Sequence, residues 1–229
     1  MIIAIDGPSG AGKSTLGKML AKDLGLLYLD TGAMYRAVGL AVLDEQINFD
    51  DKEKVSEIAV NANIELVGEP ENQKVFLDRL DVSIEIRTAQ VGQAASIVST
   101  ISEVRKILVE HQRTLGENSA KGCVLDGRDI GTVVFPNADA KFFLTAKPEA
   151  RALRRYEEDL AKGRAETTFE ETLAEINLRD KRDVTRADSP LTIAEDAVVI
   201  DTSELDLREV FEQMMQVVRE SQNAKSKTF

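Results

Sequence analysis

The chain alternates short, continuous apolar runs with longer segments in which apolar residues recur every three or four positions. The apolar runs cover residues 2–5, 26–29, 123–125, 141–144 and 197–200. Runs of this length and composition are typical of strands buried on both faces, as in a parallel sheet. We therefore expect five short, buried strands.

Helical spacing fills most of the gaps between these runs. The first helix has an apolar face formed by Leu16, Met19, Leu20 and Leu24. Gly25 follows it, where a left-handed helix end forms most easily. Further helices are expected over residues 33–43 and 102–115. A last helix opens at Asp206, whose side chain and that of Glu209 can cap each other's free N–H groups. Strands alternating with helices predict an α/β fold, with a five-stranded parallel sheet flanked by helices.

Residues 51–100 do not continue the alternation of buried strands and helices. Val55, Ile58 and Ala59 indicate a helix. Three short strands are expected after it, at residues 64–67, 74–77 and 80–83. The Gly- and Pro-containing segment 68–72 resembles a hairpin connection between the first two. Antiparallel pieces between βα units indicate a small insertion of β-strands and a helix on the parallel core of one domain.

A glycine-rich segment joins the first strand to the first helix. It matches the pattern G-x-x-x-x-G-K-[ST] with Gly7, Pro8, Ser9, Gly10, Ala11, Gly12, Lys13 and Ser14. Glycines allow successive backbone N–H groups to turn inward around phosphate oxygens. Lys13 can reach the β- and γ-phosphates, and the Ser14 hydroxyl, with Thr15 beside it, can bind Mg²⁺. The strand–loop–helix context predicts a nucleotide phosphate site, but the motif does not separate kinases from GTPases, ATPases or motors.

Arginines are grouped although the chain is acidic. Arg128 follows a strand end, where open α/β sheets bind ligands. Arg151, Arg154 and Arg155 fall on one predicted helix. Arg179, Asp183 and Arg186 have the spacing of one helix face. Each of these arginines can be read as a solvated ion-pair partner; together they suit the charge on a transferring phosphoryl group.

Other chemistry has weak candidates. His111, the single histidine, falls on the apolar side of its helix, and Cys123, the single cysteine, begins a buried strand. No Cys/His cluster suggests zinc, and no carboxylate is marked as a general base. An acceptor that is itself a phosphate needs no base, because its oxygen is already anionic.

Composition and charge narrow the class of protein further. The 229 residues carry a net charge of -11, which repels a polyphosphate backbone, so we expect no nucleic-acid partner. A single cysteine excludes an intrachain disulfide and fits a reducing compartment. The start Met1–Ile5 has no basic region, and no apolar run spans a bilayer. We expect a cytoplasmic protein without a membrane partner, and a monomer.

Several motifs resemble, in order and over nearly the whole chain, those of the cytidylate kinase family of nucleoside monophosphate kinases. They lie at residues 5–15, 28–36, 85–88, 104–105, 126–136 and 179–187. The run Asp126-Gly127-Arg128-Asp129-Ile130-Gly131-Thr132-Val133-Val134-Phe135-Pro136 is far more specific than the glycine-rich loop.

The resemblance implies phosphoryl transfer from ATP, with Mg²⁺, to CMP or dCMP, giving ADP and CDP or dCDP. It implies one P-loop kinase domain over residues 1–229, a monophosphate-binding insertion at 60–100 and a lid at 150–168. The implied monophosphate site contains Thr31, Tyr35, Arg36, Ser96, Arg105, Arg128, Asp129, Arg179, Asp183 and Arg186. The expected catalytic residues are Lys13, Arg128, Arg154 and Arg179. Residues 7–15 would bind ATP, and Ser14 and Asp126, the latter directly or through water, would bind the metal.

Cytosine recognition has a physical basis in this set. The cytosine 4-amino group is a donor that Asp129 can accept, while O2 and N3 suit Arg105 and Ser96. Uracil would place an oxygen against Asp129, and an unpaired buried polar group costs about 1–3 kcal/mol. Two alternatives stay open: a small P-loop kinase that acts on a hydroxyl, such as a shikimate- or coenzyme-type kinase, and a nucleotide-regulated binding module without turnover.

Overall fold

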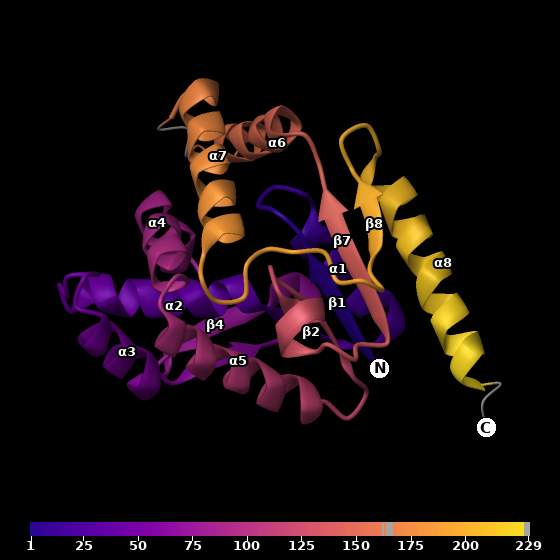
Figure 1. Ribbon diagram of the computed structural model, residues 1–229, viewed down its shortest axis with the longest axis horizontal. Helices are drawn as coiled ribbons and strands as arrows, with labels where there is room; N and C mark the ends of the chain where they lie inside the picture. The colour runs from indigo at the N-terminus through magenta and orange to yellow at the C-terminus, as the bar shows by residue number, and fades with distance from the viewer. Residues whose placement is uncertain (162, 164–166, 227–229) are drawn as a thin grey trace.

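A five-stranded parallel sheet forms the centre of the computed structural model, which describes residues 1–161, 163 and 167–226 (Figure 1). Its strands are β1 (Ile2–Asp6), β2 (Leu27–Asp30), β6 (Cys123–Asp126), β7 (Ala140–Thr145) and β8 (Val198–Asp201). Their order across the sheet is β2-β6-β1-β7-β8, and every neighbouring pair is parallel. The five strands expected from the apolar runs are confirmed.

Helices cover both faces of this sheet because strand residues alternate in direction. Ile3 and Ile5 pack under α1 (Lys13–Leu24) and α8 (Leu207–Ser226). Ala4, between them, packs on the other side with Val109 of α5 (Ser102–Glu117) and with a π-helical turn, η3 (Ile130–Val134). In Figure 1, α8 runs beside β8 while α5 lies near β2, on the opposite side of the sheet.

The expected helix ends are confirmed. Gly25 has φ 64° and ends α1, with its N–H donating to Lys22 O. At the start of α8, Glu209 N donates to Asp206 Oδ1 and Asp206 N donates to Glu209 Oε2, both at 2.9 Å. These reciprocal bonds satisfy N–H groups that a helix start leaves without partners.

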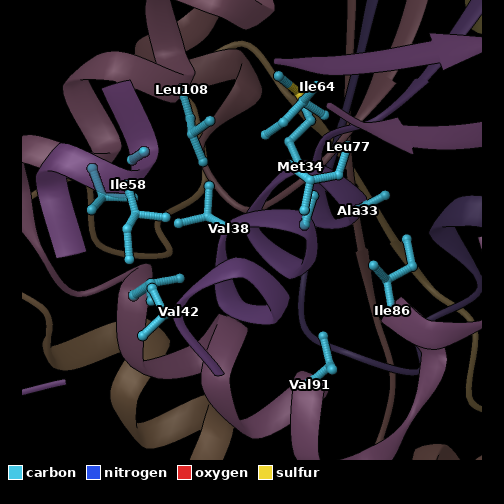
Figure 2. Packing of buried hydrophobic residues seen from close by; sticks show 14 of the residues in the cluster. Ala33, Met34, Val38, Val42, Ile58, Ile64, Leu77, Ile86, Val91 and Leu108 are labelled. Carbon is cyan, nitrogen blue, oxygen red and sulfur yellow. The ribbon is translucent and has the colours of Figure 1, made fainter. Parts of the chain in front are cut away.

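A second core lies to the left of the sheet in Figure 1. It joins helices α2 (Thr31–Asp44), α3 (Lys52–Asn61) and α4 (Ala89–Val98) to an antiparallel sheet. That sheet has the order β3-β4-β5, and its strands are β3 (Ile64–Val67), β4 (Lys74–Leu77) and β5 (Leu80–Asp81). Two 3₁₀ turns accompany it, η1 (Pro70–Asn72) and η2 (Glu85–Arg87). Figure 2 shows Met34 and Val38 of α2 among Ile58, Ile64 and Leu108, so the insertion shares its core with neighbouring helices.

The third strand of the insertion is shorter than expected. A strand over residues 80–83 was predicted, but β5 ends at Asp81. Asp81 Oδ1 accepts a hydrogen bond from Ser83 N, which turns the chain, and Ser83 Oγ accepts one from Val75 N. Side chains of this kind compete with the strand ladder for backbone groups.

The turn between β4 and β5 uses two residues with positive φ. Asp78 has φ 49° and Arg79 has φ 72°. Two left-handed residues match the twist of a hairpin, although glycine or asparagine is the usual choice. Asp78 Oδ1 also accepts a hydrogen bond from Asn63 N at 2.9 Å, which fixes the first residue of the turn.

The last two helices are α6 (Pro148–Ala161) and α7 (Phe169–Thr185), which pack against each other above the sheet in Figure 1. Thr168 caps α7 together with Glu171. Residues 162 and 164–166 of the expected lid lie outside the described residues. Nowhere in the described chain is there a helix with the length and apolar character needed to cross a membrane.

Candidate active site

Three neighbouring strands of the central sheet end in aspartate. They are β1, β6 and β2, which end in Asp6, Asp126 and Asp30, and all three side chains are buried. Strand register places Asp30 opposite Asp126. Ligands of open α/β sheets bind outside the carboxyl ends of the strands, so these aspartates mark the floor of a candidate site.

The glycine-rich loop leaves β1 directly above this floor. Gly7 has φ 141°, and a Cβ placed there would lie 2.0 Å from Leu144 O, so a side chain has no room. Gly12 has φ 88° and stands at the N-cap of α1. The loop therefore needs its glycines for backbone conformation and close packing, and it precedes a helix N-terminus that attracts phosphate.

The loop lysine points back over its own loop. Lys13 Nζ donates to Pro8 O at 2.7 Å, and the side chain is buried. Burial, with Arg128 next in effect, lowers the pKa of Lys13 to about 7. A phosphate group beside the ammonium would favour its charged form.

Ser14 and Asp126 form the candidate metal position. Ser14 Oγ donates to Asp126 Oδ2 at 2.7 Å, and Tyr28 Oη donates to Asp126 Oδ1 at 2.9 Å. Burial and the charge of Asp30 raise the pKa of Asp126 to about 6. Two adjacent hard oxygens fit Mg²⁺, which takes few protein ligands and completes its shell with water and phosphate. The described residues contain no group of three or more His, Cys, Asp or Glu side chains arranged to hold a metal.

Asp6 connects the loop strand to the turn that follows β6. Its two carboxylate oxygens accept hydrogen bonds from Ile130 N at 2.8 Å and Gly131 N at 2.7 Å. These bonds hold the start of η3, where Asp129 is the first flanking residue. Burial raises the pKa of Asp6 to about 6 in spite of the two bonds.

Asp129 lies in a cluster of buried charges. Arg105 Nη2 donates to Asp129 Oδ2, and Arg186 Nη2 lies 3.7 Å from Asp129 Oδ1. The Arg105 guanidinium also stacks over the Tyr35 ring, 5.5 Å from its centroid, and donates to Ser99 O. The spacing of Arg186 predicted that it would share a helix face with Arg179, but α7 ends one residue before Arg186. The Arg186 side chain nevertheless reaches the cluster around Asp129.

A second arginine group lies between this cluster and the phosphate loop. Arg128 Nε donates to Asp183 Oδ2 at 2.7 Å. Arg179 is partly buried, and its Nε, which is shielded from solvent, has no hydrogen-bond partner. Burial, then Arg128, lowers the pKa of Arg179, while burial, then Arg87, lowers the pKa of Arg36. Crowded, desolvated cations of this kind are suited to a multiply charged anion.

The insertion contributes through η2 and α4. Arg36 Nη1 donates to Ile86 O at 2.8 Å, and Arg87 Nη2 donates to Asp30 Oδ2 at 2.9 Å. Ser96 is buried on α4, and its Oγ has no hydrogen-bond partner. A buried hydroxyl without a partner is rare, so Ser96 stands out as a candidate ligand-binding group.

These groups open on one cleft of about 1160 Å³. Of the residues predicted for the monophosphate site, those lining it are Thr31, Tyr35, Arg36, Arg105, Arg128, Asp129, Arg179, Asp183 and Arg186. Ser96 lies behind its neighbours Ala95 and Ser99 in the cleft wall. Residues 9–15 of the phosphate loop line the other end, while Gly7 and Pro8 shape the loop from behind.

The sequence missed several residues of this site. Asp6, Asp30 and Arg87 lie in the motifs that resemble the family but were given no role, because each interacts with a residue from a distant part of the chain. Arg154 donates to Thr202 Oγ1 at 3.0 Å, which brings the 202–207 segment to the cleft. His111 is half-buried on α5, and Cys123 lies at the far end of β6 from Asp126, as expected of residues without a role here.

Comparison with known proteins agrees with this geometry. The family model described as cytidylate kinase matches residues 3–220. A protein named cytidylate kinase from Caldanaerobacter subterraneus subsp. tengcongensis is 54% identical over 219 residues, 96% of this chain and 95% of that protein. One of the same name from Bacillus subtilis is 45% identical over 95% of this chain and 96% of its own length.

A solved structure of an uncharacterized protein from Eubacterium ventriosum shares the fold, with a TM-score of 0.50, 14% identity, and coverage of 96% of this chain and 98% of that one. The matching family model and relatives cover nearly the whole chain, including the phosphate loop and the charged cluster around Asp129. The chain is thus an enzyme of the nucleoside monophosphate kinase type, and it belongs to the cytidylate kinase family.

Proposed function

We propose that the protein transfers the γ-phosphoryl group of ATP to CMP or dCMP, giving ADP and CDP or dCDP. The observation that carries this proposal is the single cleft shared by the phosphate loop and the buried cluster of Asp129, Arg105 and Arg186. One end is suited to a triphosphate and the other to a polar ring, and arginines lie between them. The names of the relatives agree with this substrate.

The donor end binds ATP in this proposal. Residues 7–15 surround the β- and γ-phosphates, and Lys13 follows the transferring group. Mg²⁺, held by Ser14 and by Asp126 directly or through water, would neutralise phosphate charge. Leu205 and Leu207, which line the cleft beside Arg154, offer an apolar surface for the adenine.

The acceptor end binds the monophosphate. Arg36, Arg128 and Arg179 would contact its phosphate, while Thr31, Tyr35 and Asp183 surround the sugar. Asp129 accepts the cytosine 4-amino group, and Arg105, Ser96 and Arg186 complete the base pocket. Residues 60–100 form the monophosphate-binding insertion, and residues 150–168, with Arg154, close over the phosphates as a lid.

The charge pattern favours a phosphate acceptor over a hydroxyl. A kinase that acts on a hydroxyl needs a carboxylate free to take its proton. At the acceptor end both candidate carboxylates are paired with arginine, Asp129 with Arg105 and Asp183 with Arg128. A phosphate oxygen needs no such base, and the surplus of arginine stabilises the charge that develops during transfer.

A panel of acceptors tests the proposal. ADP formation from ATP and Mg²⁺ is measured with CMP, dCMP, UMP, AMP, GMP, shikimate as a hydroxyl acceptor, and no acceptor. We expect CMP and dCMP to give the highest kcat/KM. Rapid ADP formation without an acceptor, or with a hydroxyl substrate only, would contradict it; nucleotide binding without turnover would favour a regulated binding module.

A further inference from the structure

Arg151 is a buried arginine outside the wall of the cleft, and it contacts three separate segments. It lies near the start of α6, at the base of the proposed lid rather than in the part that would close, and its side chain is 3% exposed. Its Nε donates to Ala146 O at 2.8 Å, its Nη1 to Ser9 O at 3.1 Å, and its Nη2 to Asp180 Oδ2 at 2.6 Å. Every nitrogen of the guanidinium is thus used, each toward a different part of the chain.

The contact with the phosphate loop is close. A Cβ placed on Gly10 would lie 3.0 Å from Arg151 Cβ and 3.2 Å from Arg151 O. The loop therefore packs on the backbone of α6 at this residue while Ser9 O accepts the guanidinium. A shift of the loop on binding phosphate would change both contacts, because packed interiors deform little.

The contact with α7 leads to the acceptor end. Asp180 directly follows Arg179, and Asp183 lies one turn further along the same helix. Those two residues line the cleft, whereas Asp180 bonds to Arg151 on α6. The other oxygen of Asp180, Oδ1, is buried without a hydrogen-bond partner, and the charge of Asp180 helps to raise the pKa of Arg128.

We propose that Arg151 and Asp180 are positioning residues that connect the phosphate loop to α7, so that binding at the donor end strengthens binding at the acceptor end. Neither residue touches the reacting atoms. Their bond fixes where α7 presents Arg179 and Asp183 relative to the loop. This inference rests on the proposed function, because it needs a triphosphate and a monophosphate bound together.

Coupling between the two nucleotides is the readout, since a purely structural bond would not change it. The Kd of CMP is measured by calorimetry alone and with a saturating non-hydrolysable ATP analogue. The reverse titration must give the same ratio, because coupling between two sites is reciprocal. We expect the analogue to tighten CMP binding by about fivefold or more in the unmodified protein.

Two conservative variants remove the connection. Asp180→Asn removes the charge at a partly exposed position, and Arg151→Lys keeps the charge but cannot reach three acceptors at once. Each variant should lower the coupling ratio, the Kd of CMP alone divided by its Kd with the analogue, by about threefold or more, which is within the range that residues between two sites contribute. The Kd of each nucleotide alone should change by less than about twofold. The double variant should lower the ratio no further than Arg151→Lys alone, because Arg151→Lys already weakens the bond that Asp180→Asn changes.

A matched control is Glu212→Gln, which breaks the exposed Arg208–Glu212 ion pair on α8 and should leave the coupling ratio unchanged. The inference is overturned if the unmodified protein shows no coupling, if both variants keep it, or if both weaken single-nucleotide binding and retain the ratio. If Arg151→Lys does not fold, Asp180→Asn alone decides. Failure of the unmodified protein to bind CMP or the analogue alone would instead refute the proposed function.

Discussion

The two ends of the cleft differ in the groups that form them, backbone groups at the donor end and charged side chains at the acceptor end. The phosphate-binding part of the donor end is one continuous segment, residues 7–15, in which glycine backbone conformation creates the site. The acceptor end is an assembly of charged side chains from α2, α5, the turn after β6 and the end of α7. A backbone site fails when the chain cannot adopt its shape, whereas a side-chain site can lose one contact at a time. Substitutions at the two ends should therefore differ in kind as well as in size.

The largest effect is expected at the donor end. Lys13→Ala removes a preorganised positive charge and only one internal hydrogen bond, to Pro8 O, so the fold should persist. Turnover should fall by about a hundredfold or more. Steady-state ADP formation and circular dichroism measure the two properties, with the exposed Lys106→Ala as control. A folded Lys13→Ala protein of normal activity would refute the phosphate-loop assignment.

Substitutions at the acceptor end should lower activity with one substrate more than with another. Asp129→Ala should narrow the CMP/UMP ratio of kcat/KM by about ten- to a hundredfold, because UMP never made the amine bond. Arg105 is buried and paired with Asp129, so Ala leaves a buried charge unpaired. Asp129→Asn keeps the volume and is the second variant. Arg36→Ala should lower both substrates together, since phosphate is common to them; an unchanged ratio in both Asp129 variants would place base recognition elsewhere.

Asp126, on the floor of the cleft between the two ends, should make the stability of the protein depend on pH. The pKa of Asp126 is raised to about 6, above its unfolded value of about 3.9, so the folded state binds more protons in this range. The free energy of unfolding contributed by this group therefore falls as the pH rises from about 4 to 6 and is level above that. Asp126→Asn should stabilise the nucleotide-free protein by about 1–3 kcal/mol at pH 8 and much less at pH 4.5.

Urea unfolding at both pH values measures this gain. Asp6→Asn is the matched comparison, because Asp6 has a similarly raised pKa but accepts two backbone N–H groups, which can only donate. The donors to Asp126 are the hydroxyls of Ser14 and Tyr28, and a hydroxyl can turn to accept a hydrogen bond from an amide N–H. An amide has one acceptor oxygen, so one N–H group would be left without its partner and the gain should be offset. An equal gain at both pH values in Asp126→Asn would show that ionisation is not the cause.

The smallest effect lies outside the cleft, in the insertion hairpin. Arg79→Gly should stabilise the protein by about 0.5–1 kcal/mol, since a left-handed non-glycine residue is strained. Asp78→Gly should gain less, because it loses the hydrogen bond from Asn63 N. Urea midpoints at pH 7 compare them, and activity should stay within about twofold. A destabilised Arg79→Gly protein would mean that the side chain contributes more than the turn geometry indicates.

The same contrast explains what the sequence could predict. The five buried strands, the Gly25 helix end and the cap at Asp206 depend on neighbouring residues, so local pattern was sufficient. The phosphate loop is likewise contiguous. Contacts between distant segments could not be predicted in this way. Asp6 meets Ile130 and Arg151 meets Ser9 across most of the chain, and the spacing of residues in the sequence does not indicate such pairs.

Local errors also had physical causes. The third strand of the insertion ends early because Asp81 and Ser83 side chains bond to backbone groups. Arg186 was placed on a helix face because its spacing fitted, but the helix ends one residue before it. The acceptor residues themselves were found only through resemblance to a family.

The crowded arginines of the cleft have a consequence for laboratory evolution. Burial and neighbouring arginines lower the pKa of Arg36 and of Arg179: Arg87, Arg155 and Arg128 act on the first, and Arg128, Arg36 and Arg155 act on the second. A screen for thermal stability of the nucleotide-free protein would thus select uncharged replacements of these arginines. The selected variants would be more stable but would have lost activity. The same screen run with both nucleotides present would favour the arginines instead, because each arginine attracts the bound phosphates and this offsets the repulsion between the arginines. The presence or absence of nucleotides during selection, more than the choice of mutations, would decide whether these arginines are retained.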